Sequence, residues 1–178
     1  FDHLTNTGYT IISLARYTGS ANYRVISSRN RNFLFGFHGA LTGRWYAEGW
    51  ISTAGPFDTD WHMHLGTIEA KGGDPQATFR RDGQTLASGS RGSNNSVFAP
   101  GLLQLGGYAS NNEKSACEIA ELIMFDRELN EVELSQLEGY IAHKWQMNND
   151  LLPATHPYFA IDPFAVGGQV EDVKTIGG

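Results

Sequence analysis

The stretch IAELIMFDRELNEVELSQLEGYIAHKW, residues 119–145, decides the fold because it combines a strand with a capped helix. Residues 118–126 are rich in branched and aromatic side chains, which favours a β-strand. Asn130 is a favourable helix N-cap, and Glu133 three positions later completes a capping box. An apolar stripe at helical spacing follows, formed by Leu134, Leu137, Ile141 and Trp145. These residues predict one C-terminal amphipathic helix over about 130–146 that packs against a sheet.

Outward from this stretch, the rest of the chain favours strands. Short apolar or alternating segments, separated by Gly, Ser and Asn, predict strands at 9–16, 24–28, 32–38, 45–51, 61–69 and 102–106, with a hairpin over 77–87. The pair Asp82-Gly83 inside that hairpin is a strong signal for a two-residue turn. Strands at this spacing without interleaved helices predict an all-β jelly-roll sandwich of two antiparallel sheets.

Composition limits the partners that the chain can have. Its 178 residues suit a single domain, and a net charge of −6 argues against binding to nucleic acid. No run of 18 apolar residues exists, so we expect no membrane insertion. Cys117 is the only cysteine, which excludes an internal disulfide and a multi-cysteine metal site.

Several motifs resemble one family. The quoted stretch is similar to the end of bacterial laminin G-like modules, which show a D-R-x-L turn, a helix ending in L-x-x-K-W and an L-P-x-x-H-P-Y tail, here at residues 152–158. Further similarity lies at 15–19, 24–27, 33–36, 46–50 and 61–62. The resemblance implies a concanavalin A-like domain over residues 1–158, with residues 159–178 as a linker or edge strand to a following module. Such modules usually begin with a further strand, which this sequence does not show before Phe1.

The resemblance also implies a setting and a function. Members are mostly carbohydrate- or protein-binding modules of longer, multidomain bacterial proteins that are extracellular or lie at the cell surface, sometimes with calcium. We therefore expect a non-catalytic adhesion module that recognises a glycan or a cell-surface or matrix protein. Two alternatives remain: a structural or protein-interaction module of a larger assembly, completed by strand exchange, or a glycoside hydrolase of the same fold.

A glycan site needs an aromatic platform beside hydrogen-bonding groups. Within the segment 44–50, alternation places Arg44, Tyr46, Glu48 and Trp50 on one face of a strand, and Tyr108 could add to the rim. These five residues are the predicted ligand-binding set. The alternative interpretation assigns Tyr46 and Trp50 to the core.

Calcium prefers oxygen ligands from loops. Asp58 and Asp60 precede one strand, and Asn111 and Glu113 precede another. If the two loops converge at one end of the sandwich, these four residues predict a calcium site. The alternative is that they are ordinary turn residues.

Two further pairs of residues are candidates for catalysis or metal binding. Glu118 and Glu121 resemble part of the E-x-D-x-x-E strand of sandwich glucanases, but the central Asp is absent and alternation predicts opposite faces for the two carboxylates. His62 and His64 share a face and could bind a metal; the alternative is that both are half-buried residues on the solvent side. Neither pair changes the expectation of a non-catalytic domain.

Overall fold

The computed structural model describes the chain except for residues 2, 54, 71, 92–98, 110–111 and 166–178. The elements in chain order are α1 (Leu4–Thr7), β1 (Tyr9–Tyr17), β2 (Ile26–Ser28), β3 (Phe33–His38), β4 (Leu41–Ala47), β5 (Trp50–Ser52), β6 (His62–Ile68), β7 (Gln76–Arg81), β8 (Gln84–Ser90), β9 (Leu103–Leu105), β10 (Cys117–Phe125), α2 (Glu131–Lys144) and α3 (Asn148–Leu151). The described strands form two five-stranded antiparallel sheets. The predicted all-β sandwich is therefore confirmed.

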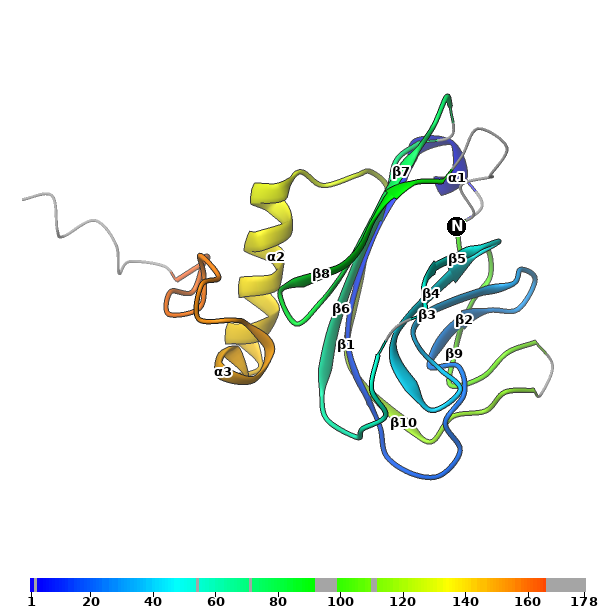
Figure 1. Cartoon of the computed structure of the whole chain (residues 1–178), viewed down its shortest axis with the longest axis horizontal. Helices are drawn as coiled ribbons and strands as arrows, with labels where there is room; N and C mark the ends of the chain where they lie inside the picture. Colours follow the sequence, from blue (N-terminus) through cyan, green and yellow to red (C-terminus); the bar gives the residue numbers. More distant parts are fainter. Residues whose placement is uncertain (2, 54, 71, 92–98, 110–111, 166–178) are drawn as a thin grey trace, which may run out of the picture.

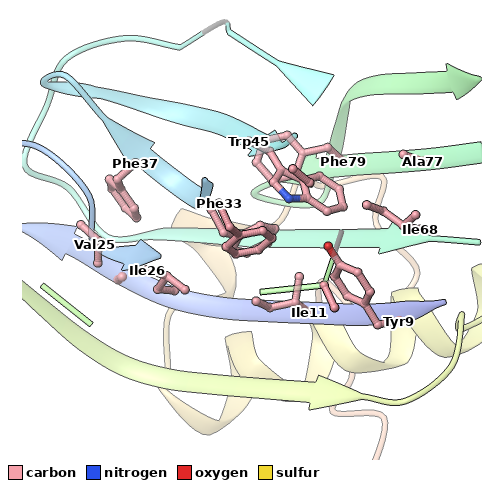
Figure 2. Close-up of a cluster of buried hydrophobic side chains, with 14 of the residues drawn as sticks. Tyr9, Ile11, Val25, Ile26, Phe33, Phe37, Trp45, Ile68, Ala77 and Phe79 are labelled. Atoms are coloured by element: carbon pink, nitrogen blue, oxygen red, sulfur yellow. The ribbon is translucent and has the colours of Figure 1, made fainter. Parts of the chain in front are cut away.

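The two sheets lie face to face, and α2 lies outside them (Figure 1). Sheet A has the strand order β10-β1-β6-β7-β8, and sheet B has the order β5-β4-β3-β2-β9. Residues of alternate positions on β1, β3, β4 and β7 fill the space between the sheets, among them Tyr9, Ile11, Phe33, Trp45 and Phe79 (Figure 2). Since these side chains are excluded from water, their burial is the main force that holds the sheets together.

Helix α2 covers the outer face of sheet A. Leu134, Leu137 and Ile141 pack with Ile12 and Leu65, which point away from the inter-sheet core. The predicted capping box is present, because Asn130 Oδ1 accepts hydrogen bonds from the backbone of residues 132 and 133 while the Glu133 carboxylate accepts one from Asn130 N. Strand β1 thus carries two apolar faces, one for each layer, which explains its nearly continuous apolar sequence.

The stripe of α2 is shorter than predicted. The Trp145 side chain is 37% exposed, and its Nε1–H donates to the Glu121 carboxylate at 3.0 Å. The prediction that Trp145 packs with the stripe is wrong, because the helix ends at Lys144 and the indole turns toward the surface of β10.

The predicted strand 45–51 is two strands. Glu48 and Gly49 adopt φ values of 51° and 157°, and Ala47 N donates to Gly49 O at 3.0 Å. This backbone reverses the chain, so that Trp50 on β5 lies opposite Tyr46 on β4. The turn at Asp82-Gly83 is confirmed, with φ values of 51° and 69°.

The carboxylates Glu118 and Glu121 share a face, so the predicted alternation is wrong at this point. The register between β1 and β10 shifts, because Leu14 pairs with Glu121 whereas Ala15 pairs with Ile119. The shift is a β-bulge at Ala120, and the extra residue turns both carboxylates to the outer face of sheet A.

His64 is fully buried between the sheets, so its expected place on the solvent side is wrong. Its Nε2 accepts a hydrogen bond from Gly43 N at 3.0 Å, and its ring stacks on Phe79 with 5.7 Å between the centroids. Burial lowers the pKa of His64 well below its ordinary value. The imidazole is therefore neutral and belongs to the core.

Gly139 makes room for the segment that follows the helices. A Cβ at this position would lie 2.5 Å from Tyr158 Cβ and 3.2 Å from Pro163 Cδ. The glycine therefore allows close packing of the C-terminal segment on the helix. The segment 159–165 packs against α2, where the ring centroids of Tyr140 and Phe164 lie 5.8 Å apart.

We expect Gly139→Ala to destabilise the domain. Alanine favours a helix by up to about 1 kcal/mol relative to glycine, but the clash with Tyr158 costs about 1–3 kcal/mol, as overpacking does elsewhere. Urea denaturation followed by circular dichroism measures the difference. A variant more stable than the wild type would show that the segment yields without cost.

The prediction that residues 159–178 form a linker or edge strand falls partly on residues 166–178, which lie outside the described part of the chain. Within the described part, no helix is long and apolar enough to cross a membrane.

Candidate functional site

Contacts between aromatic and charged side chains form a continuous row on and beside β3, β4 and β5. In the described part of the chain, no helix lies over this outer side of sheet B (Figure 1). We call this row the belt; its members are Tyr108, Arg24, Glu113, His38, Trp50, Arg44 and Tyr46. The belt brings together four of the five predicted ligand-binding residues and adds Arg24, His38 and Glu113.

Trp50 forms the open end of the belt. Its side chain is 45% exposed, whereas Trp45 on the neighbouring strand is fully buried. The Tyr46 ring meets the indole edge-on at 5.2 Å between centroids, and Arg44 Cζ lies 5.5 Å from the indole centroid. The interpretation that Trp50 belongs to the core is therefore wrong.

Trp50 is also fixed at its backbone. Its carbonyl oxygen accepts a hydrogen bond from Arg91 Nη1 at 3.4 Å, and Arg91 Nη2 donates to Ala47 O at 2.8 Å. Because Arg91 bonds to both sides of the β4–β5 turn, the indole is presented by a restrained hairpin rather than by a free loop.

The other end of the belt is an ion pair on an aromatic ring. Arg24 Nε donates to the Glu113 carboxylate, and its guanidinium lies 3.9 Å above the centroid of the Tyr108 ring. Arg24 Nη1 also donates to Phe33 O at 3.1 Å. A buried arginine with these three partners is held rigidly, so Tyr108 is held with it.

His38 links the two ends. Its Nε2 lies 3.6 Å from Glu113 Oε2, and its ring centroid lies 6.3 Å from that of Trp50. Burial lowers the pKa of His38, although Glu113 opposes the shift. At neutral pH the imidazole is therefore uncharged, whereas the guanidinium of Arg44 lies over the exposed indole.

Glu48 is not on the strand face where alternation placed it. It lies in the β4–β5 turn with an exposed side chain, next to the open end of the belt. Arg24 and His38 were not among the predicted ligand-binding residues. The sequence does contain a signal for His38. Phe33, Phe35 and Phe37 take alternate positions and are buried, so alternation places the next residue, His38, on the opposite, outer face of the strand.

Three of the four predicted calcium ligands, Asp58, Asp60 and Glu113, lie in the described part of the chain. The Asp58 carboxylate accepts from Asp60 N at 3.3 Å and lies 2.8 Å from His62 Nε2. Burial disfavours the charged form of His62, but its hydrogen bonds to Asp82 and Asp58 outweigh burial and raise its pKa. The Asp58 carboxylate is therefore already paired with the imidazole of His62.

Glu113 is engaged with Arg24 in the belt, and Asn111 lies outside the described residues. Across the described ranges, no group of three or more His, Cys, Asp or Glu side chains could hold a metal ion. Calcium binding, which also draws on backbone oxygens, stays a prediction.

The carboxylates on β10 are both paired with cations. Glu118 accepts from Arg16 Nε at 2.8 Å, and Glu121 accepts from Lys144 Nζ at 2.7 Å. The pair therefore has the contacts of surface ion pairs.

No protein-family model matches the chain, and no curated protein matches it. Among solved structures, the binding domain of Paraclostridial Mosquitocidal Protein 1 matches with a TM-score of 0.50 and 15% identity over 75% of this chain and 37% of that chain. The binding domain of Botulinum Neurotoxin DC in complex with SialylT gives 0.48 and 11% over 75% and 35%.

A Trypanosoma rangeli sialidase mutant that displays trans-sialidase activity gives a TM-score of 0.46 at 17% identity, over 72% of this chain and 22% of that chain. This chain thus spans about a fifth to two fifths of the structures it matches. Likeness at such identities concerns the fold and not the site. The chain is a β-sandwich of two antiparallel sheets, similar in fold to the binding domain of the mosquitocidal protein.

Proposed function

We propose that this domain is a non-catalytic carbohydrate-binding module of the laminin G-like type and that the belt is its ligand site. The observation that carries the proposal is the exposed indole of Trp50, which lies on an open sheet face beside Arg44 and Tyr46. A sugar ring has apolar faces that stack on an indole and hydroxyls that need hydrogen bonds. The belt offers both kinds of contact within one surface.

Arg44 has the free hydrogen-bonding capacity that such a ligand requires. Its side chain is partly exposed beside Trp50, and no hydrogen bond of its guanidinium is present among the described residues. We infer that Arg44 donates to hydroxyl or carboxylate oxygens of a glycan whose ring lies on Trp50. Restraint of the hairpin by Arg91 lowers the entropy lost on binding.

An extracellular or cell-surface location, within a longer protein, is part of the proposal and rests on the sequence resemblance. The binding domain of the mosquitocidal protein, which matches with a TM-score of 0.50, supports a binding role in general terms. The hydrolase alternative finds less support, since Glu118 and Glu121 are each paired with a cation. Calcium assistance is retained as a prediction.

A glycan array probed with the fluorescently labelled domain tests the proposal. We expect Trp50→Ala to weaken binding of the retained glycans at least tenfold, about 1.4 kcal/mol, because the stacking surface is lost. Phe164→Ala is the matched control, since this phenylalanine is 59% exposed but lies on α2 at the far side of sheet A. A folded wild-type domain that retains no glycan, or equal losses in both variants, contradicts the proposal.

The assembly alternative has one observation in its favour. Strand β9 is an edge of sheet B, and Leu102 and Leu105 at this edge are 57% and 51% exposed. An apolar edge strand can pair with another chain. Sedimentation velocity separates the alternatives, because strictly monomeric behaviour at high concentration contradicts strand exchange.

A further inference from the structure

A hollow lies beside sheet A, and none of its lining residues belongs to the belt. Its lining comes from the start of β6 and from the region of α3, and its volume is about 620 Å³. The lining residues are Asp60, Trp61, His62, Met147, Asn149 and Asp150. We call it the end pocket. A volume of this size falls within the range of small-molecule sites.

The walls of the end pocket are held by contacts outside it. The guanidinium of Arg16 lies 4.9 Å from the centroid of the Trp61 ring, and Arg16 is itself held by Glu118 at 2.8 Å. Arg16 covers one side of the indole, and Glu118 holds Arg16 in place, so the orientation of the indole is fixed. A fixed aromatic wall binds a ligand with less loss of entropy than a mobile one.

His62 is fixed in the same way. Its Nδ1 lies 2.6 Å from Asp82 Oδ2 and its Nε2 lies 2.8 Å from Asp58 Oδ1. Both ring nitrogens are therefore occupied, and His62 contributes a polar surface that does not require the ligand to complete it.

The remaining polar groups of the pocket are free. Among the described residues, the side chains of Asp60, Asn149 and Asp150 make no hydrogen bond or ion pair, and all three are exposed. Two carboxylates supply acceptors, and one amide supplies both a donor and an acceptor. Opposite them, Trp61 and Met147 supply apolar surface.

This combination selects the ligand. Vicinal hydroxyls of a sugar ring can donate to the carboxylates and accept from the amide, while the apolar face of the ring rests against Trp61. An anionic sugar would face two carboxylates with no free cation among the lining residues. The end pocket thus differs from the belt, where Arg44 offers an unpaired guanidinium next to Trp50.

We propose that the end pocket, formed by Trp61, Met147, Asp60, Asn149 and Asp150, is a second saccharide site that takes a neutral, hydroxyl-rich sugar and rejects anionic ones. The proposal extends the carbohydrate-binding function, but it uses no residue of the belt. A domain with two such sites can contact two sugar units or two chains at once, which raises its avidity for a polysaccharide surface.

Proton–nitrogen correlation spectra of the labelled domain test the proposal. The probes are the methyl glycosides of glucose, mannose and galactose as neutral sugars, glucuronic acid as an anionic sugar, and glucosamine and calcium chloride as cations, each at millimolar concentration. We expect at least one neutral glycoside to shift the indole signal of Trp61, which Trp61→Phe assigns. Glucuronic acid is expected to leave that signal in place.

Two variants decide whether the site is the one proposed. The double variant Asn149→Ala/Asp150→Ala is expected to weaken binding of the neutral probe at least tenfold. Asp126→Ala is its matched control, because it removes an exposed carboxylate that follows the last residue of β10 and does not line the end pocket. Trp50→Ala should leave the Trp61 response unchanged, so failure of the belt and failure of the end pocket are distinguished.

Three outcomes overturn the proposal. The first is a Trp61 signal that no neutral glycoside shifts. The second is a shift with glucosamine or calcium in the absence of any shift with neutral sugars, which would make the pocket a cation site. The third is equal binding of the neutral probe by the double variant and the wild type.

Discussion

Replacing Trp45 with alanine is expected to lower the free energy of unfolding by about 3–5 kcal/mol, which is a large part of the stability of a domain this size. The indole is fully buried between the sheets and lies beside Phe79 (Figure 2). The ring centroids of Phe35 and Phe79 each lie 5.4 Å from that of Trp45. Because the neighbouring rings are fixed by two sheets, the cavity left by the indole cannot close. Guanidinium denaturation followed by the fluorescence of the remaining tryptophans measures the loss.

The position opposite Trp45 makes this prediction specific. A Cβ on Gly66 of β6 would lie 2.6 Å from Trp45 Cζ3 and 2.8 Å from Phe35 Cε2, so the indole occupies the space that a side chain would take. We expect Gly66→Ala to cost about 1–3 kcal/mol alone and to cost much less in the Trp45→Ala background. Strict additivity of the two losses would show that the two residues do not compete for the same space.

The second large effect is expected at Glu138, whose carboxylate is buried between α2 and sheet A. It lies 3.0 Å from Arg80 Nη2 and 3.2 Å from His156 Nε2, and its side chain is 1% exposed. Glu138→Ala would leave the buried His156 imidazole without its anionic partner, and Arg80 with only the exposed Glu131 carboxylate, 3.2 Å from its Nη1. We expect a loss of about 3–5 kcal/mol, as for other buried pairs from which one partner is removed.

Glu118→Ala is the matched control for Glu138→Ala, since Glu118 is paired with Arg16 but is 52% exposed. A surface pair of this kind contributes about 0–1 kcal/mol. Chemical denaturation of the two variants side by side gives the comparison. Similar losses in both would contradict the view that burial, and not pairing, sets the cost.

The sequence by itself determined the layers of this protein and the start of its main helix. Local patterns suffice for this, because capping at Asn130, the two-residue turn at Asp82-Gly83 and the alternation of β3 depend on neighbouring residues only. The same patterns placed Arg44 and Tyr46 on one face, where the structure has them.

Only the tertiary structure decided which groups meet. The turn at residues 48–49 brings Trp50 beside Tyr46 from a separate strand, whereas alternation along one strand would have set them further apart. A single extra residue at Ala120 brings Glu118 and Glu121 to the same face, whereas alternation assigns them to opposite faces. Such local irregularities are stabilised by pairing with distant strands, and therefore the sequence of the segment does not reveal them.

The belt and the end pocket depend on contacts of still longer range. Arg24 meets Glu113 across 89 positions of the chain, and Trp61 and Asp150 join one hollow from two distant segments. Residue types indicate which side chains can stack or donate hydrogen bonds. Composition and periodicity do not predict which of these side chains lie next to one another. The surfaces that present these side chains to a ligand are set by the packing of sheet on sheet and of helix on sheet.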